Sequence, residues 1–294
     1  MADALQRSLL PSALPHPDRL AVTARYLPAV AGTQAGGDWF DVLELDGGRI
    51  AVAVGDVVGD GAPAAAVMGQ LRSSLATLLL AGFSPARALE LLDRFATQVA
   101  GARVSTAACV HLDPESGELT YSRAGHPPPL RLDEGTATYL EAGHGPALGV
   151  SPAGRRPETV TTLPTGATLL LYTDGLVERR GATLDDGLAR LATVATSHRS
   201  APLPALLDEV LADLVVGGAD DDIAVVALRR LPEALHLDLP AQPQQLRRLR
   251  AVVQHWAEEA ALAPPASRTC SWPSARRRPT PSSTPTATPT HPAA

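Results

Sequence analysis

The sequence contains no lysine, so all 25 of its basic residues are arginine. Aromatic residues make up only 3% of the chain, and the core must therefore be built from Ala, Leu and Val. The net charge of −6 argues against a nucleic-acid-binding surface. Apolar residues nevertheless reach 45%, which excludes a chain that is disordered throughout.

Cysteine is also scarce. Cys109 and Cys270 are too few for a disulfide framework or a cysteine-based zinc site, and Cys109 is expected in the core. The chain opens with no signal-peptide pattern, and its longest uncharged apolar run, around Leu75–Phe83, is too short to span a membrane. We therefore expect a cytoplasmic protein that has no membrane partner.

Short strands and paired helices follow one another along the first 231 residues. The apolar patterns predict helices at Ala62–Gly82, from Ser84 onward, at Leu184–Thr196 and at Pro202–Val216. They predict strands at Leu20–Leu27, Trp39–Leu45, Arg49–Val58, Val104–Leu112, Leu119–Ala124, Thr136–Leu140, Ala167–Thr173 and Ile223–Leu228. This order predicts an α+β domain of antiparallel sheets covered by helices, ending near Leu231.

Four acidic motifs lie at the ends of the predicted strands. They are Gly36–Asp41, Gly55–Gly61, Tyr172–Gly175 and Asp220–Ile223. Each motif alone is typical of an ordinary turn. Carboxylates at the ends of buried strands, however, cost desolvation energy unless something compensates their charge, and no arginine lies within the motifs. Hard divalent cations are the simplest compensation, and several carboxylates around two ions form a site for phosphoryl chemistry.

In this order the motifs resemble those of the PP2C-like metal-dependent (PPM) protein phosphatases, in the bacterial SpoIIE/RsbU branch. Further matching stretches are Ala62–Met68, Ala124–Pro129, Gly145–Gly149 and Leu170–Glu178. The resemblance covers roughly residues 5–230. It implies a four-layer α-β-β-α sandwich of two antiparallel sheets flanked by helices, over residues 16–231.

The resemblance also implies a ligand set for two Mn²⁺ or Mg²⁺ ions. Asp38 and Asp56 would bind metal, with Asp56 bridging both ions and the backbone carbonyl of Val57 completing one coordination sphere. Asp174 and Asp221 would bind the other ion. Asp56 and Asp174 would then act through metal-bound water, which attacks phosphorus in line without a phospho-enzyme.

Other residues of the motifs are expected to support these ligands. Asp41 and Asp222 are interpreted as neighbours of the ligands or as surface residues. His126 could protonate the leaving alkoxide or anchor the turn into Pro127–Pro129, and we favour the structural role. Asp60 stands where many relatives carry histidine, and Ala224 where threonine is commoner; neither is a ligand position.

The end of the chain has a different composition. Residues 232–262, with a predicted strand Leu235–Leu239 and helix Gln244–Ala261, resemble the opening of the ATPase domain of anti-sigma serine kinases. The Glu-x-x-x-Asn motif of that domain is missing, so we expect a truncated domain without kinase activity. Residues 263–294 are a Pro/Ser/Thr-rich stretch that we interpret as a disordered tail. A one-base shift of GC-rich codons for Arg268–Pro285 permits the missing motif, so we hypothesise a frameshifted tail, which the nucleotide sequence would test.

The expected function is a protein serine/threonine phosphatase. By analogy with the branch, its substrate would be a phosphorylated anti-anti-sigma (STAS-type) protein in a partner-switching pathway. Residues 1–15, read as the remnant of a helix, offer a route to a dimer. Two alternatives stay open: a non-catalytic interaction module of phosphatase fold, and an ATP-binding anti-sigma kinase, which the missing asparagine motif disfavours.

Overall fold

The computed structural model describes residues 10–11, 13–29, 36–152, 154–179, 181–233, 237 and 245–259. Of residues 257–259 it describes the backbone alone. Residues 1–9 and 263–294 lie outside the described residues, as does the predicted strand Leu235–Leu239 apart from Leu237. The helix predicted at Gln244–Ala261 is present as α6, Gln245–Glu259. None of the described helices is long and apolar enough to cross a membrane.

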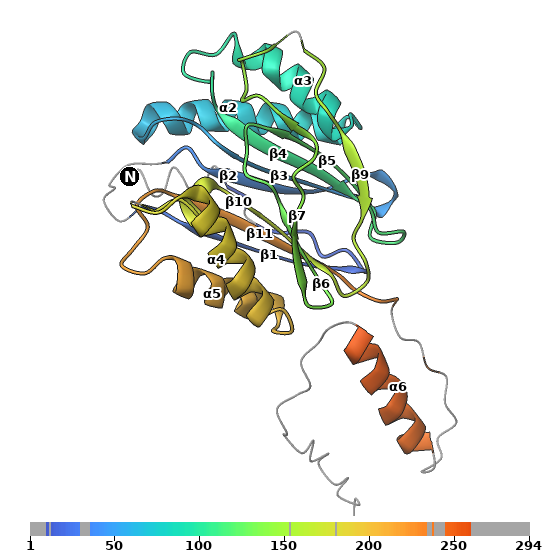
Figure 1. Ribbon diagram of the computed structural model, residues 1–294. Helices are drawn as coiled ribbons and strands as arrows, with labels where there is room; N and C mark the ends of the chain where they lie inside the picture. Colours follow the sequence, from blue (N-terminus) through green and yellow to red (C-terminus); the bar gives the residue numbers. More distant parts are fainter. Residues whose placement is uncertain are drawn as a thin grey trace, which may run out of the picture. The chain divides into compact units, whose positions relative to one another are not determined.

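Two sheets lie face to face at the centre of the domain (Figure 1). The first has the order β1-β11-β10-β6-β7, with every pair antiparallel. Its strands are β1 Leu20–Leu27, β11 Ile223–Arg230, β10 Thr168–Tyr172, β6 Leu130–Asp133 and β7 Thr136–Tyr139. The second has the order β2-β3-β4-β5-β8, with β9 also on β5 and with β8 parallel to β5. Its strands are β2 Trp39–Glu44, β3 Ile50–Asp56, β4 Thr106–Leu112, β5 Glu118–Ala124, β8 His144–Gly145 and β9 Thr159–Thr162.

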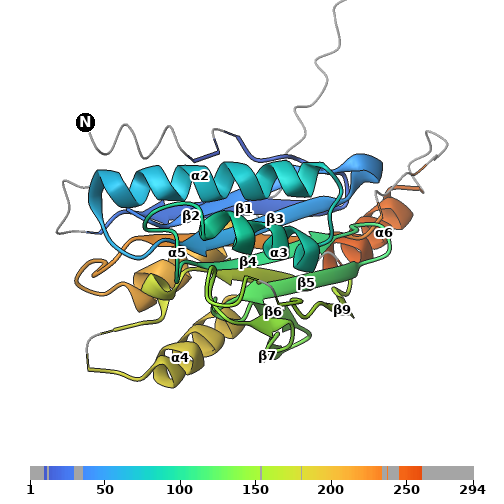
Figure 2. The ribbon, with the colours of Figure 1, turned by 90° about the horizontal axis from the view of Figure 1, so that it is seen from above.

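Helices cover the outer face of each sheet, as Figures 1 and 2 show. The second sheet is covered by α2, Gly61–Leu80, and α3, Pro85–Ala96, and the first sheet by α4, Leu184–Ser197, and α5, Leu203–Leu214. Helix α2 buries apolar residues at helical spacing, among them Val67, Leu71 and Leu75. The α-β-β-α order of layers predicted from the sequence is confirmed.

Small aliphatic residues fill the core, as the shortage of aromatic residues requires. One buried cluster lies between the sheets, and one lies under each helical layer. Trp39, Met68 and Cys109 are fully buried, and for Cys109 this confirms the place in the core expected from the sequence. Strand β11 is buried along all eight of its residues because a neighbouring strand flanks each edge and a layer covers each face.

The sequence patterns did not predict three of the strands. They are β6, β8 and β9, with four, two and four residues. Strand β9 reads Thr-Val-Thr-Thr and is half exposed, so it presents no apolar run. Strands this short are held by their neighbours in the sheet rather than by their own composition. Strand β1, in contrast, has the predicted bounds.

A buried ion pair joins α3 to the loop before β9. Arg156 Nε donates a hydrogen bond to Asp93 Oδ2 at 2.9 Å, and Arg156 Nη2 lies 2.7 Å from the same oxygen. Both side chains are at most 2% exposed. The other oxygen of Asp93 accepts a hydrogen bond from the Gly149 backbone N–H at 2.8 Å. Asp93 therefore holds the segment 146–156 against α3.

Replacing Asp93 should unfold the domain more easily. Asp93→Ala leaves the Arg156 charge buried without a partner, and we expect a loss of about 3–5 kcal/mol in the free energy of unfolding. The matched control is Arg87→Ala, which breaks the exposed pair with Glu90 and should cost less than about 1 kcal/mol. Urea unfolding followed by circular dichroism measures both; a loss below about 1 kcal/mol for Asp93→Ala would contradict this account.

Candidate metal centre

The four acidic motifs lie at one end of the two sheets. Asp38 directly precedes β2, and Asp56 is the last residue of β3. Because β2 and β3 are antiparallel, with Trp39 opposite Gly55, the two aspartates share one end of the second sheet. In the first sheet Asp174 follows β10 and Asp221 precedes its antiparallel neighbour β11, so these two share an end in the same way.

Glycines let the motifs approach one another without side chains in between. A Cβ atom on Gly37 would collide with the carbonyl oxygen of Val57, and one on Gly36 would collide with the carboxylate of Asp222. A Cβ atom on Gly175 would collide with the carbonyl oxygen of Asp222. The loop before β2 therefore contacts both the end of β3 and the start of β11, which brings the two sheet ends together.

Acidic side chains are concentrated at this junction, and none of the described arginines forms an ion pair with Asp38, Asp56, Asp174 or Asp221. Asp38 is 2% exposed, and its Oδ2 has no hydrogen-bond partner among the described residues. The pKa of Asp38 is raised well above its usual value, mainly by burial and next by the negative charge of Asp56. Burial, followed by the charge of Asp174, raises the pKa of Asp56 to about 7. Asp174 has a raised pKa as well, from burial and then from Glu178.

The Asp174 and Asp221 carboxylates open onto the surface. With Gly175, Glu178, Arg179 and Asp220 they line an open hollow of about 320 Å³. Arg179 does not compensate this charge by hydrogen bonding: its guanidinium donates to the carbonyl oxygens of Gly175 at 2.7 Å and of Leu214 at 3.1 Å. The hollow gives a substrate access to the aspartates from solvent.

Hard divalent ions fit this arrangement. In the described part of the chain, no three carboxylate, imidazole or thiolate groups are close enough together to enclose an ion by themselves. Magnesium-like ions need no such enclosure, because they keep several waters and take only one or two carboxylates from the protein. The unpartnered oxygen of Asp38 and the Val57 carbonyl beside Gly37 are oxygen donors of the required kind.

Asp41 and Asp222 have partners within the protein. Asp41 is buried under α2, where its carboxylate pairs with Arg72 at 2.6 Å. Asp222 is buried at the start of β11, where its Oδ1 accepts a hydrogen bond from the Ala29 backbone N–H at 2.9 Å. Neither is a surface residue. Asp222 lies beside the cluster and positions the loop before β2, whereas Asp41 ties β2 to α2.

His126 is enclosed between the two sheets. Its Nδ1 lies 2.8 Å from the hydroxyl of Thr106 and its Nε2 lies 3.0 Å from the carbonyl oxygen of Tyr172, and the side chain is 2% exposed. Burial lowers the pKa of His126 to about 4. With both ring nitrogens engaged, His126 links β4 to β10, which agrees with the structural role favoured from the sequence.

Sequence reasoning missed two residues of the site. Thr173 is fully buried; its hydroxyl accepts a hydrogen bond from the Ala224 N–H at 2.9 Å and also bonds the Asp38 carboxylate, which lowers the Asp38 pKa against the larger effect of burial. Glu178 lines the hollow near Asp174. Both belong to the stretch Leu170–Glu178, so their place in that motif was the available signal.

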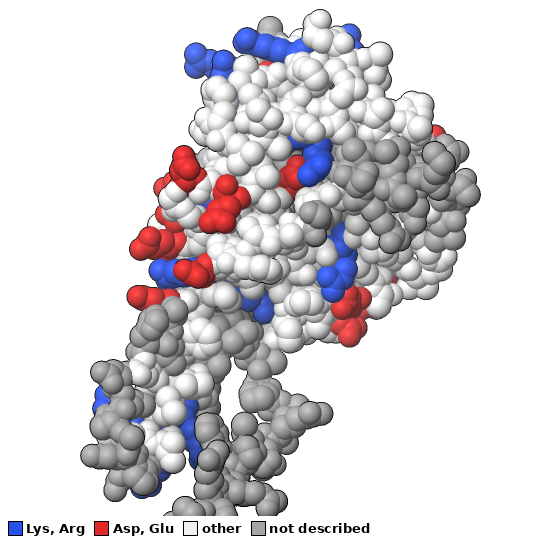
Figure 3. Space-filling model, turned by 180° about the vertical axis from the view of Figure 1, so that it is seen from behind, with Lys and Arg blue, Asp and Glu red and all other residues white. Residues whose placement is uncertain are grey.

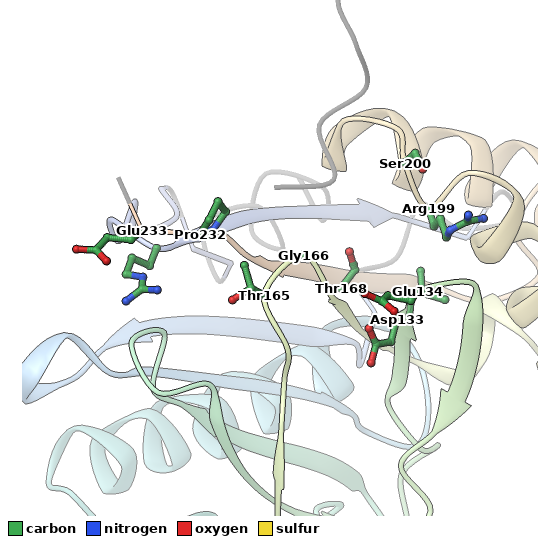
Figure 4. Close-up of a pocket in the computed structure, with 11 residues that line it drawn as sticks. Asp133, Glu134, Thr165, Gly166, Thr168, Arg199, Ser200, Pro232 and Glu233 are labelled. Atoms are coloured by element: carbon green, nitrogen blue, oxygen red, sulfur yellow. The ribbon is translucent and has the colours of Figure 1, made fainter. Parts of the chain in front are cut away.

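A larger cavity of about 420 Å³ lies at the opposite end of the first sheet, where β1 and β10 begin (Figure 4). Figure 4 shows Asp133 and Glu134 on the β6–β7 turn, Arg199 and Ser200 after α4, and Pro232 and Glu233 after β11. This cavity is lined by none of the proposed metal ligands Asp38, Asp56, Asp174 and Asp221. Arg19 and Arg199 line it together with Asp133, Glu134 and Glu233, so it carries charges of both signs.

The layered fold and the position of the acidic junction place the chain among the PP2C-type phosphatase folds. The SpoIIE phosphatase domain of Bacillus subtilis, solved with a fragment of its regulatory domain, is similar in fold, with a TM-score of 0.60 at 19% identity over 72% of this chain and 63% of that one. The family described as Stage II sporulation protein E (SpoIIE) matches residues 46–231, and the chain belongs to this family.

Closer likenesses come from two further proteins. The structure of the RsbU and RsbW domains of Rv1364c from Mycobacterium tuberculosis matches with a TM-score of 0.72 and 38% identity, over 86% of this chain and 72% of that one. Phosphoserine phosphatase RsbU of Bacillus subtilis is 29% identical over 178 residues, which cover 60% of this chain and 52% of RsbU. The chain spans about half the length, or less, of the curated relatives that it matches.

The buried His126 should make stability depend on pH. Its pKa is about 4 in the folded protein and about 6.5 when unfolded, so the unfolded chain binds the proton first as the pH falls. Stability from this group is complete above pH ~6.5 and falls by about 3 kcal/mol between pH ~6.5 and ~4. Urea unfolding at several pH values, compared with His126→Gln, isolates the effect; equal pH slopes for the two proteins would contradict it.

Proposed function

We propose that the chain is a protein serine/threonine phosphatase that depends on divalent metal ions. The observation that carries this proposal is the junction of Asp38, Asp56 and Asp174, three carboxylates with raised pKa values at one end of two buried sheets. Membership of the SpoIIE family and similarity to RsbU, which is named a phosphoserine phosphatase, support the same activity.

In this proposal the aspartates divide between two ions, Mn²⁺ or Mg²⁺. Asp38, Asp56 and the Val57 carbonyl hold one, Asp174 and Asp221 hold the other, and Asp56 is shared. Such ions lower the pKa of water and neutralise phosphoryl oxygens when bound. The chain's own contribution is to position these oxygens: Thr173 hydrogen-bonds the Asp38 carboxylate, and the lack of a side chain at Gly37 leaves room for the Val57 carbonyl oxygen.

We infer that the substrate is a phosphorylated anti-anti-sigma (STAS-type) protein. RsbU, which is named a phosphoserine phosphatase, supports a phosphoserine substrate, and the family resemblance supports a STAS-type protein as its carrier. The Rv1364c structure adds a second point, because it joins an RsbU domain to an RsbW domain. It covers about 253 of our 294 residues (86%), more than the 231 that precede Pro232. This supports reading residues 232–262 as the start of a second domain. A dimer through residues 1–15 stays a prediction.

Removing one ligand charge should abolish hydrolysis. We expect Asp56→Asn and Asp174→Asn each to lower Mn²⁺-dependent hydrolysis of p-nitrophenyl phosphate on the order of 100-fold or more, because each variant loses an ion ligand. Asp185→Asn, which changes an exposed carboxylate in the first turn of α4, is the matched control and should stay within about twofold of wild type.

Calorimetric titration with Mn²⁺ checks the same variants without turnover. We expect two ions per chain in the wild type and weaker binding in Asp56→Asn. Hydrolysis that survives both substitutions would contradict the proposed site. Ion binding without hydrolysis in the wild type would instead favour the alternative, a non-catalytic interaction module of this fold.

A further inference from the structure

A tight turn borders the aspartate cluster on the second sheet. Residues 101–105 lead into Thr106, the first residue of β4, and Thr106 lies opposite Asp56 in the β3–β4 register. Val104 stands two residues before Thr106, and because two residues span at most about 7 Å, its Cα lies within that distance of the Thr106 Cα. Arg103 is one residue further on. The turn therefore lies within a long side chain's reach of the end of β3.

The backbone of this turn is strained at Val104. Its φ is +71°, and no other non-glycine residue in the described ranges has a positive φ. A β-branched residue in this conformation is an outlier that only strong surrounding contacts maintain. The Val104 N–H donates to the Leu148 carbonyl at 2.8 Å, and the Leu148 N–H donates to the Ser105 carbonyl at 2.9 Å. The Val104 side chain is nevertheless 54% exposed, so burial of this side chain does not offset the free-energy cost of the strained backbone.

The neighbouring Arg103 is exposed and makes no hydrogen bond or ion pair with any residue that the structure describes. Its stem lies across Gly149, where an added Cβ would come 3.0 Å from the Arg103 Cγ. Several other arginines are tied to carboxylates, namely Arg25, Arg72, Arg87 and Arg156. Figure 3 shows both situations on one face: some basic side chains lie beside acidic ones, whereas other basic side chains do not.

Val150, next to Gly149, is also 54% exposed. An uncommitted guanidinium and two exposed valines therefore lie on the turn that precedes β4 and next to the glycine it contacts. A small phosphate ester has no groups to contact the valines, whereas a polypeptide has. We propose that Arg103, Val104 and Val150 form the docking edge for a phosphoprotein substrate, with Arg103 binding phosphate or carboxylate oxygens of the segment that carries the phosphorylated residue. The inference rests on the proposed phosphatase function and names how that site selects polypeptides.

Two substrates separate docking from chemistry. With Mn²⁺ present, Arg103→Ala should lower kcat/KM for phosphorylated β-casein by about tenfold, since a charge-assisted hydrogen bond is lost. Hydrolysis of p-nitrophenyl phosphate should change by less than about twofold. Arg103→Lys should recover part of the loss, because it keeps the charge but not the bidentate geometry. Arg49→Ala, at the opposite end of β3 from Asp56, is the matched control and should affect neither substrate.

Val104→Gly tests the strain. Glycine adopts positive φ freely, so this variant should unfold at an equal or higher temperature than wild type. It should nevertheless lose about fivefold in kcat/KM for β-casein through the missing apolar contact. A variant that unfolds at a lower temperature, or that keeps full activity on β-casein, would count against a functional role for this turn.

A binding measurement keeps the inference testable if hydrolysis is not found. Fluorescence anisotropy of a labelled β-casein phosphopeptide, in the Asp56→Asn background so that no turnover occurs, should show about tenfold weaker binding after Arg103→Ala. Unchanged binding, or equal losses of kcat/KM for both substrates, would overturn the docking edge. Failure of wild-type hydrolysis together with an Arg103-dependent affinity would overturn the proposed function alone.

Discussion

Mutual repulsion of carboxylates inside a low-dielectric junction is the constraint on which the rest of the site depends. Two unit charges about 5 Å apart at an effective dielectric constant of about 20 repel by roughly 3 kcal/mol, and Asp38, Asp56 and Asp174 combine such repulsion with burial. The backbone contacts at Gly36, Gly37 and Gly175, with the hydroxyl of Thr173, hold these groups together against that repulsion. Binding of a cation at the sheet ends would relieve this repulsion, so the site favours cations.

The same chain compensates buried carboxylates elsewhere, which makes the junction distinctive. Asp41 pairs with Arg72, and Asp93 pairs with Arg156. Buried arginines without a carboxylate, such as Arg229, are satisfied instead by the hydroxyl of Thr168 and by backbone carbonyl oxygens. Where a charge serves packing, the protein supplies its partner. At the acidic junction it does not, and that difference within one molecule distinguishes a binding site from a structural ion pair.

The sequence was sufficient for elements with a strong local pattern and insufficient for those defined by distant partners. Strand β1 and the helices follow from apolar periodicity, whereas β9 consists of half-exposed threonines that only pairing with β5 makes a strand. The aspartates could be selected by their motifs. Thr173 lies within one of these motifs, but its role depends on the β10–β11 register that brings Ala224 to its hydroxyl, which the motif does not show. Such non-local pairings are invisible in composition and spacing.

The position of the free arginine follows from the same electrostatics. A guanidinium paired directly with one of the aspartates would neutralise the charge that attracts metal ions, as Arg72 does for Asp41, whereas Arg179 lines the hollow but donates to backbone carbonyl oxygens. Arg103 lies instead on the turn before β4 and pairs with none of the described carboxylates. From there it still meets an incoming phosphoprotein directly. Separating the ion-binding charge from the substrate-binding charge lets one shallow site attract both cations and anions.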